Sequence, residues 1–503
     1  MSFNLATILR DSTSERPDAP FLHVEDQTLT YRDVDESSGR VARSLRNRGL
    51  MPGDKVAVQL PNGPEFVTTY FAILKAGLVV VPLNPLFTSW EIEYHLTDSE
   101  SRMLVTSTFS TASALDGAAR ADVTDIVVVG AEPPVGTEAY ESLLEAEVMA
   151  GMHPATADDT AVLLYTSGTT GRPKGAELTH FSLYMNCTMA PRHFDMTSED
   201  VILGVLPLFH VFGLSSVLNT AARFGSSVAL LPRFEVEAAL DAMQQHSVSV
   251  LIGVPTMFTA FLGADLAARA IGSLRAAVSG GASIPGEVIR GFEEKFPGVV
   301  VLEGYGLSET SSSACFNISA AERKVLSIGK PIWGVEMTIL GTDGVPLPAG
   351  AEHVGEVAVR GHCVMKGYYN RPEATAQAVR DGWLHTGDLG YRDADGYFFI
   401  VDRLKDLIVR GGYNVYPREI EEVLYDHPDI VEAAVVGRAD SRLGEEVEAF
   451  VVLRPGSAVD EQALTAYTRQ YLAAYKYPRS FHMVPELPKG ATGKILKREL
   501  RRG

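Results

Sequence analysis

The sequence has little cysteine, no long hydrophobic run and a shortage of positive charge. Its three cysteines, Cys187, Cys315 and Cys363, are too few and too scattered for a disulfide framework or a zinc site, which predicts a reducing compartment. The best apolar stretch, residues 71–83, contains Lys75 and a proline and is too short to span a bilayer. Neither a signal peptide nor a terminal Ser-Lys-Leu address is expected, so we predict a cytoplasmic protein without a transmembrane segment.

The balance of charges excludes one broad class of partner. There are 44 lysines and arginines against 63 aspartates and glutamates, a formal net charge of −19 at pH 7. A polyphosphate backbone would be repelled, so nucleic acid is not expected as a partner. Small anions must instead be captured by local groups. A chain of 503 residues also exceeds what one core accommodates, which predicts several domains.

Strands alternate with helices along the first 330 residues. Helical spacing covers residues 31–45, 65–76 and 90–96, and buried strands are predicted at 56–60, 79–81, 103–106, 201–205, 227–231, 248–252, 276–278 and 299–302. This alternation predicts an α/β fold class with parallel sheets covered on both faces. After about Gly329 short β runs broken by turns predict a small β-barrel or distorted sheet.

A second, smaller domain is predicted at the C-terminal end. The charged patch at residues 401–406 separates two apolar strands and marks the boundary, giving an N-terminal domain of residues 1–404 and a C-terminal lid domain of residues 405–503. Within the lid, an α+β unit is expected from helices at 418–425 and 461–475 and strands at 431–436 and 447–452.

The most informative stretch is YTSGTTGRPKG, residues 165–175, directly after an apolar run. Glycines let the backbone approach a phosphate, and hydroxyls and an ammonium group add donors and charge. The phosphate-binding residues predicted here are Thr166, Ser167, Gly168, Thr169, Thr170, Gly171 and Lys174. The stretch lacks the Gly-Lys-Ser/Thr ending of a Walker A loop, and a plain surface turn is the alternative.

Four further stretches accompany this loop: LPLFHVFGL (206–214), EGYGLSET (303–310), HTGDLG (385–390) and PKGATGKIL (488–496). With these motifs in their usual order across essentially the whole chain, the sequence resembles the adenylate-forming superfamily of acyl-CoA synthetases, luciferases and peptide-synthetase adenylation domains. It is most similar to bacterial fatty acid–CoA ligases. The resemblance implies ATP, Mg²⁺ and coenzyme A as cofactors, and a small-molecule carboxylic acid as substrate.

The resemblance also assigns roles to single residues around ATP. Glu309, whose carboxylate suits Mg²⁺ held by phosphates, is implied as the metal ligand together with Thr166, with Thr310 near the α-phosphate. Asp388 and Arg403 are implied on the ribose hydroxyls; the alternatives are an Asx turn and a solvated charge. The other nucleotide-binding residues implied are Gly281, Ala282, Glu303, Gly304, Tyr305 and Gly306, with Tyr305 against the adenine.

The remaining roles concern catalysis and the lid. Lys494 is implied as the adenylation lysine, since a positioned ammonium stabilises the charge that develops at the α-phosphate. Lys405 resembles the hinge residue, with an exposed linker lysine as the alternative. The segment that would line the pantetheine path is Arg410, Gly411, Gly412 and Tyr413. His210 is implied as an aromatic gate beside the acyl pocket rather than a base, and a packed core histidine remains possible.

The implied reaction has two steps, acyl-adenylate formation with release of pyrophosphate and acyl transfer to the thiol of coenzyme A with release of AMP. His210 stands where amino-acid-activating members carry Asp, which disfavours an amino acid. The pocket residues expected within 254–316 include no arginine pair for a second carboxylate, which disfavours malonate; they are Met257, Phe258, Phe261, Gly281, Gly306 and Ser311 to Ser313. A medium- to long-chain fatty acid is the first prediction and an aryl or cinnamate-type acid the second.

Other classes of protein remain open alternatives. Luciferase-like oxidation and loading of a carrier-protein thiol share the first step and stay open. A P-loop phosphotransferase is disfavoured because neither residues 165–175 nor Gly490 to Lys494, a Gly-x-x-Gly-Lys sequence followed by Ile495, match a Walker A loop. A non-catalytic regulator is disfavoured because Lys494, Glu309 and Asp388 are all present. A monomer or homodimer is expected.

Overall fold

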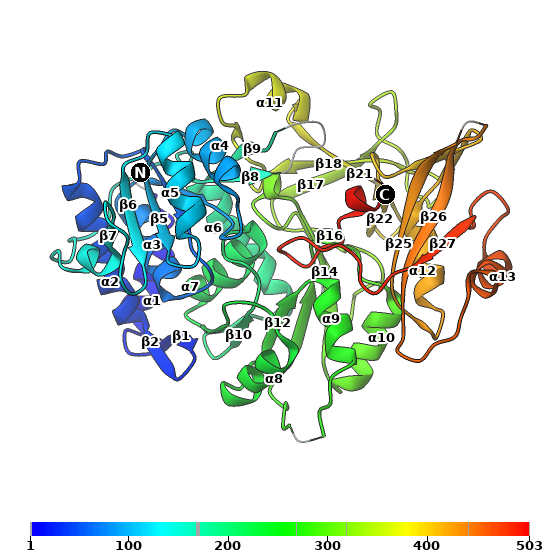
Figure 1. Cartoon of the computed structure of the whole chain (residues 1–503), viewed down its shortest axis with the longest axis horizontal. Coiled ribbons are helices and arrows are strands. Elements are labelled where there is room, and N and C mark those ends of the chain that lie inside the picture. Colours follow the sequence, from blue (N-terminus) through cyan, green and yellow to red (C-terminus); the bar gives the residue numbers. More distant parts are fainter. Residues whose placement is uncertain (1–2, 167–171, 268, 318, 441, 502–503) are drawn as a thin grey trace.

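The first subdomain of the computed structural model is an eight-stranded sheet in the order β19-β9-β8-β4-β3-β5-β6-β7 (Figure 1). The structure describes residues 3–166, 172–267, 269–317, 319–440 and 442–501. The strands are β3 (Lys55–Gln59), β4 (Val79–Pro82), β5 (Ser101–Ser107), β6 (Asp125–Val129), β7 (Glu138–Ala139), β8 (Thr160–Thr166), β9 (Lys174–Thr179) and β19 (Gly367–Tyr368). From β8 to β7 the pairings are parallel, as the sequence predicts, whereas β9 and β19 are antiparallel additions.

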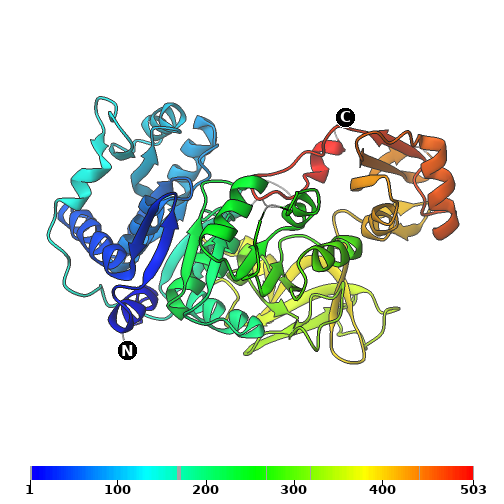
Figure 2. The same cartoon turned by 90° about the horizontal axis from the view of Figure 1, so that it is seen from below.

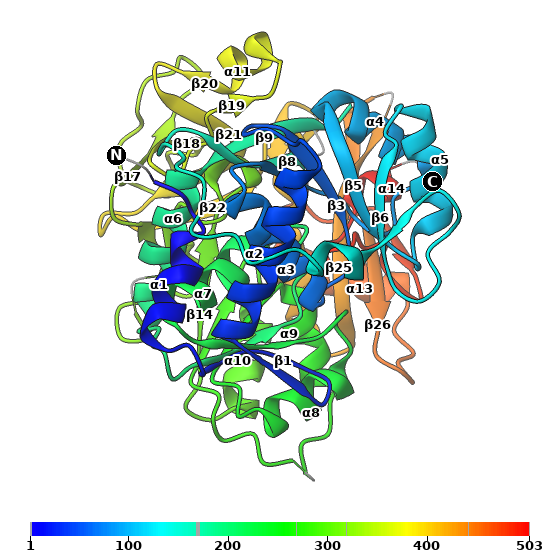
Figure 3. The same ribbon diagram turned by 90° about the vertical axis from the view of Figure 1, so that its left-hand side faces the viewer.

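Helices cover both faces of this sheet. The side chains of β3 alternate, so that Val56 and Val58 pack toward α2 (Tyr31–Asn47) and α3 (Pro64–Lys75) while Ala57 packs toward α4 (Ser89–Ser99) and α5 (Thr111–Arg120). Figure 3 shows these two helix pairs on opposite sides of β3, β5 and β6. Capping boxes at Thr30 and Thr88 fix where α2 and α4 begin.

The second sheet has nine strands in the order β16-β15-β14-β13-β12-β10-β11-β1-β2. They are β1 (Pro20–Val24), β2 (Gln27–Thr30), β10 (Val201–Gly204), β11 (Ser227–Leu230), β12 (Val250–Gly253), β13 (Ala276–Ser279), β14 (Val300–Tyr305), β15 (Cys315–Phe316) and β16 (Lys330–Pro331). The helices of this region are α1 (Thr7–Glu15), α6 (His180–Met189), α7 (Thr220–Phe224), α8 (Val236–Gln245), α9 (Pro255–Leu262) and α10 (Gly286–Lys295). The predicted strands from 201 to 302 are confirmed.

Short helical segments complete the N-terminal part. They are the 3-10 segments η1 (Tyr140–Leu144), η2 (Ala190–Phe194) and η4 (Ser308–Thr310), and the π-helix η3 (Phe212–Asn219). The predicted small β unit is an antiparallel sheet of β17 (Val335–Leu340), β18 (Gly355–Gly361), β20 (Val379–Arg380), β21 (Trp383–Arg392) and β22 (Phe398–Arg403), with α11 (Pro372–Ala378) beside it.

The C-terminal part is the predicted α+β unit, drawn orange to red at one end of the molecule (Figure 2). It contains β23 (Ile408–Arg410), β24 (Tyr413–Val415), α12 (Pro417–Tyr425), β25 (Ile430–Asp440), β26 (Gly444–Leu453), α13 (Glu461–Tyr471), β27 (Ser480–Met483) and α14 (Lys497–Leu500). The helix predicted over residues 461–475 ends at Tyr471, because Leu472 turns to an extended conformation and is buried in this unit's core.

Two separate cores lie on either side of the predicted boundary. The main N-terminal core extends to Phe398, and the C-terminal core begins at Ile408. The segment after β27 then leaves the C-terminal unit and runs back to the second sheet, where the hydroxyl of Thr256 on α9 donates to the carbonyl of Gly493 (3.1 Å). The division at 404/405 and the mobility of the lid stay predictions.

Candidate active site

The carboxyl ends of β10, β12, β13 and β14 open into a cavity of about 880 Å³. In α/β sheets this end of the strands is where ligands bind. The β8–β9 hairpin, the small β sheet and the segment after β27 close its other sides. Of the residues predicted from the sequence, those that line it are Thr166, Lys174, His210, Gly281, Gly304, Tyr305, Gly306, Glu309, Arg403, Lys405 and Lys494.

The two described ends of the stretch predicted to bind phosphate lie on paired strands. β8 ends at Thr166 and β9 begins at Lys174, and these two residues pair directly across the hairpin. The Lys174 ammonium lies 5.1 Å from the centre of the Tyr368 ring, at the edge of the cavity. Ser167, Gly168, Thr169, Thr170 and Gly171 lie outside the described residues, so their predicted phosphate contacts stay predictions.

Glu309 lies on the short segment η4 that follows β14. One carboxylate oxygen, Oε1, accepts a hydrogen bond from the Tyr368 hydroxyl (2.8 Å), and the Glu309 carbonyl accepts one from the backbone of Met365 (2.8 Å). No cluster of three metal-binding side chains occurs within the described ranges. The Glu309 carboxylate and the Thr166 hydroxyl both line the cavity, and hard oxygen ligands of this kind fit Mg²⁺ carried mainly by phosphate groups.

The buried aspartate Asp388 contacts both the Tyr305 hydroxyl and the Arg403 guanidinium. Asp388 is 3 % exposed; its Oδ2 accepts from the Tyr305 hydroxyl (2.6 Å), and its Oδ1 lies 3.1 Å from Arg403 Nε. Burial and the Asp388 charge raise the pKa of Tyr305, so its hydroxyl remains a donor. The carboxylate is therefore held in place with lone pairs left for a diol.

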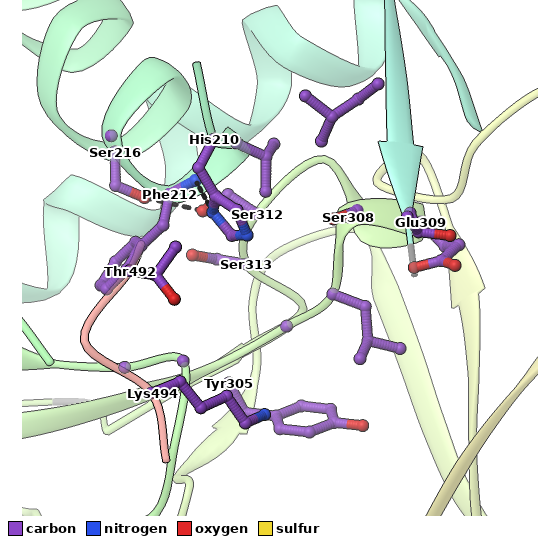
Figure 4. A pocket seen from close by; sticks show the side chains of 18 of the residues that line it. His210, Phe212, Ser216, Tyr305, Ser308, Glu309, Ser312, Ser313, Thr492 and Lys494 are labelled. Carbon is purple, nitrogen blue, oxygen red and sulfur yellow. Dashed lines mark hydrogen bonds between the residues drawn. The ribbon is translucent and has the colours of Figure 1, made fainter. Parts of the chain in front are cut away.

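Lys494 enters the cavity on a turn that the N-terminal domain holds. Backbone bonds from Gly493 to Gly490 and from Gly490 to Lys494 (both 2.8 Å) close the turn, and Gly493 has a φ of +77° that favours glycine. Figure 4 shows the Lys494 side chain extending toward Tyr305. Burial, then the positive charges of Arg403 and Lys405, lower the pKa of Lys494 to about 8.

This pKa predicts a pH dependence of ATP binding. A lysine with a lowered pKa loses its cation as the pH rises through about 8, so the free enzyme should bind ATP more weakly above it. Raising the pH from about 7 to about 9 should increase the dissociation constant of ATP by up to about tenfold. Nucleotide displacement without carboxylic acid would measure it. An unchanged pH dependence in Lys494→Ala would contradict the assignment to this group.

His210 is neutral at physiological pH. Burial, and secondarily the charge of Lys494, lower its pKa to about 4. The backbone N–H of Phe212 donates to His210 Nδ1 (3.4 Å), which places the imidazole proton on Nε2. His210 is therefore a neutral hydrogen-bond donor that lines the cavity. This geometry suits the predicted gate; a catalytic role for His210 stays a prediction.

One wall of the cavity is shaped by a π-helix and a strained serine turn. Phe212 and Ser216 on η3 and Thr220, the first residue of α7, line this wall, and Ser216 Oγ lies 2.8 Å from Ser312 Oγ. Ser312 has a φ of +110°, and its carbonyl packs so closely that a Cβ on Gly306 would lie 1.6 Å from it. Such strain persists only where its surroundings enforce it.

Several predicted residues do not line the cavity. Glu303 is buried and faces Arg418, Glu422 and Arg323 rather than the nucleotide, and burial raises its pKa to about 8. Thr310 caps the turn at Leu307 instead of opening into the cavity. Asp388 does not line the cavity itself, but it contacts two residues that do, Tyr305 and Arg403. Also outside the lining are Ala282, Arg410, Gly411, Gly412 and Tyr413, of which the last four lie on β23, β24 and their turn.

Two family descriptions match the chain, AMP-binding enzyme over residues 9–369 and AMP-binding enzyme C-terminal domain over residues 419–494. The chain belongs to the AMP-binding enzyme family. This AMP-binding enzyme is an AMP-forming acid–thiol ligase that uses ATP, Mg²⁺ and coenzyme A, and its substrates are small-molecule carboxylates. Among its described helices, none is long and apolar enough to cross a membrane.

Known proteins similar to this AMP-binding enzyme differ in the acid that their names specify. The chain is 38 % identical to the long-chain-fatty-acid–CoA ligase of Bacillus subtilis, over 99 % of this chain and 94 % of the relative. It is also 38 % identical to a feruloyl-CoA synthase of Amycolatopsis, over 94 % of both chains. The ATP-bound crystal structure of MatB from Rhodopseudomonas palustris superposes with a TM-score of 0.92 at 33 % identity, over 100 % and 99 % of the two chains.

Sequence reasoning missed the partners that hold the predicted residues. Tyr368 contacts both Glu309 and Lys174 but lies in none of the five motifs. The pair Ser216 and Ser312 was not recognised because serines on a helix and in a turn carry no spacing signal. Asn186 was also missed; its side chain makes two hydrogen bonds to the backbone of Ser313 (2.7 and 3.1 Å) and thereby holds the serine turn.

Proposed function

We propose that this AMP-binding enzyme activates a monocarboxylic acid that carries no second charged group, with a medium- to long-chain fatty acid as the first choice. The observation that carries this proposal is the distribution of cations. Among the described lining residues the lysines and arginines are Lys174, Arg380, Arg403, Lys405, Lys494 and Arg498, and they lie on the nucleotide and lid sides. The acyl wall of α6, η2, η3 and the 304–316 turn supplies none, so a second carboxylate would be buried unpaired.

In the first half-reaction a carboxylate oxygen attacks the α-phosphorus of ATP. The new O–P bond forms as the bond to pyrophosphate breaks, so no protein nucleophile is required. Lys494 stabilises the negative charge that develops between the acid and the α-phosphate, and Lys174 holds the departing phosphates. Asp388 orients the ribose, and His210 offers its Nε2 proton at the acyl entrance. When bound, Mg²⁺ neutralises phosphate charge beside Glu309 and Thr166.

In the second half-reaction the thiol of coenzyme A displaces AMP and forms the thioester. Lys405 is the hinge about which residues 405–503 turn, since it lies between the two cores. The turn carrying Gly411 and Gly412, both with positive φ, lies away from the cavity in this arrangement and would line the pantetheine path after the rotation. The free, buried cysteines are compatible with the proposed cytoplasmic location.

An aryl acid is the second candidate, and one feature of the pocket favours it. Four phenylalanines, Phe194, Phe209, Phe212 and Phe316, line the acyl side, and stacked or edge-on contacts with rings would stabilise a planar substrate. The similarity to a feruloyl-CoA synthase agrees with this alternative.

A panel of acids tests the proposal. We expect AMP release with ATP, Mg²⁺ and coenzyme A from straight-chain acids of roughly four to eighteen carbons, because an apolar, uncharged pocket binds them by burial. Coumarate and benzoate test the aryl alternative. Malonate tests whether the acyl wall lacks a cation that would pair with a second carboxylate. Turnover of malonate at the rate of the best monocarboxylate would contradict the proposed substrate class.

A further inference from the structure

Tyr368 links the two ends of the phosphate side of the cavity. Its hydroxyl donates to Glu309 Oε1 (2.8 Å), and its ring lies 5.1 Å from the Lys174 ammonium. Burial and the neighbouring Glu309 charge raise the pKa of Tyr368, so the hydroxyl donates throughout the physiological range. Tyr368 thus contacts the carboxylate proposed for the metal and the lysine proposed for the departing phosphates.

The backbone holds Tyr368 at this point. β19 pairs with β9, the strand that carries Lys174, and sets Tyr368 opposite Ala176. The hydroxyl of Thr375 accepts from the Tyr368 N–H (2.9 Å), and three residues earlier Met365 donates to the carbonyl of Glu309 (2.8 Å). The short segment from Met365 to Tyr368 is therefore bonded both to β9 and to the Glu309 backbone, which fixes the tyrosine relative to both.

Only one of the two carboxylate oxygens of Glu309 is used in a hydrogen bond within the described residues. Glu309 lines the cavity; its Oε1 accepts the hydrogen bond from the Tyr368 hydroxyl, and its Oε2 accepts none from a protein donor within the described ranges. A hydrogen bond to one oxygen restricts rotation of the carboxylate and orients the other. Partners of this kind typically change metal affinity or activity by about 10- to 100-fold when removed.

We propose that Tyr368 is a positioning residue for adenylation: its hydroxyl orients Glu309 toward Mg²⁺, and its ring holds Lys174 toward the phosphates that leave. This inference rests on the proposed function, in which Glu309 binds the metal. Tyr368 touches neither the reacting carboxylate nor the α-phosphorus in this role, so it acts through Glu309 and Lys174.

Tyr368→Phe removes the hydroxyl and keeps the ring. Calorimetric titration of ATP with and without Mg²⁺ should show that the factor by which Mg²⁺ tightens ATP binding falls about tenfold, while binding without Mg²⁺ is unchanged. Tyr369→Phe is a matched control. It removes a hydroxyl that also bonds a glutamate, Glu100 (2.6 Å), but Tyr369 does not line the cavity. A wild-type Mg²⁺ effect in Tyr368→Phe, or an equal loss in Tyr369→Phe, would overturn the proposal.

Tyr368→Leu tests the ring. Loss of the cation–π contact, worth about 0.5–1 kcal/mol, should weaken ATP binding by about two- to fivefold even without Mg²⁺. If the Leu and Phe variants bind ATP equally tightly without Mg²⁺, the Tyr368 ring does not hold Lys174 in the proposed way. Transfer of a preformed acyl-adenylate to coenzyme A should stay at the wild-type rate in both variants.

Glu309→Gln separates this inference from the function on which it rests. If that variant keeps the wild-type Mg²⁺ effect, the proposed metal role of Glu309 is wrong. If Glu309→Gln loses the effect and Tyr368→Phe retains it, the metal role holds and only the positioning role of Tyr368 fails.

Discussion

Lys494→Ala is expected to slow acyl-adenylate formation by about 10²- to 10³-fold, the loss that follows removal of one preorganised transition-state donor. Lys494 lines the cavity close enough to Asp388 and Arg403 for their charges to act on it, and its turn is docked on α9 through Gly493. An alanine supplies no positive charge there. Pyrophosphate release in a single turnover measures the step, and the acyl transfer from preformed acyl-adenylate to coenzyme A should remain close to wild type.

Lys489→Ala is the matched control for this variant. Lys489 lies on the same segment but pairs with Glu432 (2.6 Å) in the C-terminal unit and does not line the cavity. Wild-type adenylation is expected from it. Full adenylation activity in Lys494→Ala, or loss of both half-reactions to the same extent, would remove Lys494 from the proposed role.

Asp388→Asn is expected to raise the KM for ATP by about tenfold to a hundredfold, since hydrogen bonds to charged groups contribute about 1.5–3 kcal/mol. The amide keeps the shape of the carboxylate and an acceptor for Tyr305, but it loses the ion pair with Arg403. The effect should be specific to the ribose. Wild type should therefore prefer ATP over 2′-deoxy-ATP, and the variant should lose most of that preference.

Asp393→Asn serves as the control, because Asp393 follows the same strand and pairs with Lys324 outside the cavity. Its KM for both nucleotides should match wild type. A variant Asp388→Asn that discriminates between ATP and 2′-deoxy-ATP as well as wild type would show that Asp388 does not bind the ribose.

The parallel strands were predictable because their environment is uniform. Strands buried on both faces read as apolar runs, and residues 201–204, 250–253 and 276–279 fall within or beside the predicted segments. The N-terminal hairpin was not predictable in the same way. β1 pairs with β11, about two hundred residues later, and nothing in five residues of alternating sequence specifies which sheet they join.

The site was predictable where a residue acts through its own chemistry. Lys494, Glu309 and Asp388 stand in motifs whose glycines and hydroxyls indicate a close approach to a ligand. The partners of these residues were not predictable, because Tyr305 and Asp388, like Tyr368 and Glu309, lie on elements that are distant in the sequence and meet only in the folded chain. Membership of a motif does not by itself place a side chain in the cavity, as Glu303 shows. It lies in EGYGLSET, yet its side chain turns toward α12.

The π-helix at Phe212–Asn219 has a consequence for the shape of the cavity. A π-helix contains more residues per turn than an α-helix, so it accommodates an extra residue within a helical segment. Removing one residue would restore α geometry inside the segment, and the side chains around the deletion would take different positions about the helix axis while the flanking elements keep theirs. The length of this segment, and not only its side chains, therefore sets which groups form the wall that Phe212 and Ser216 line.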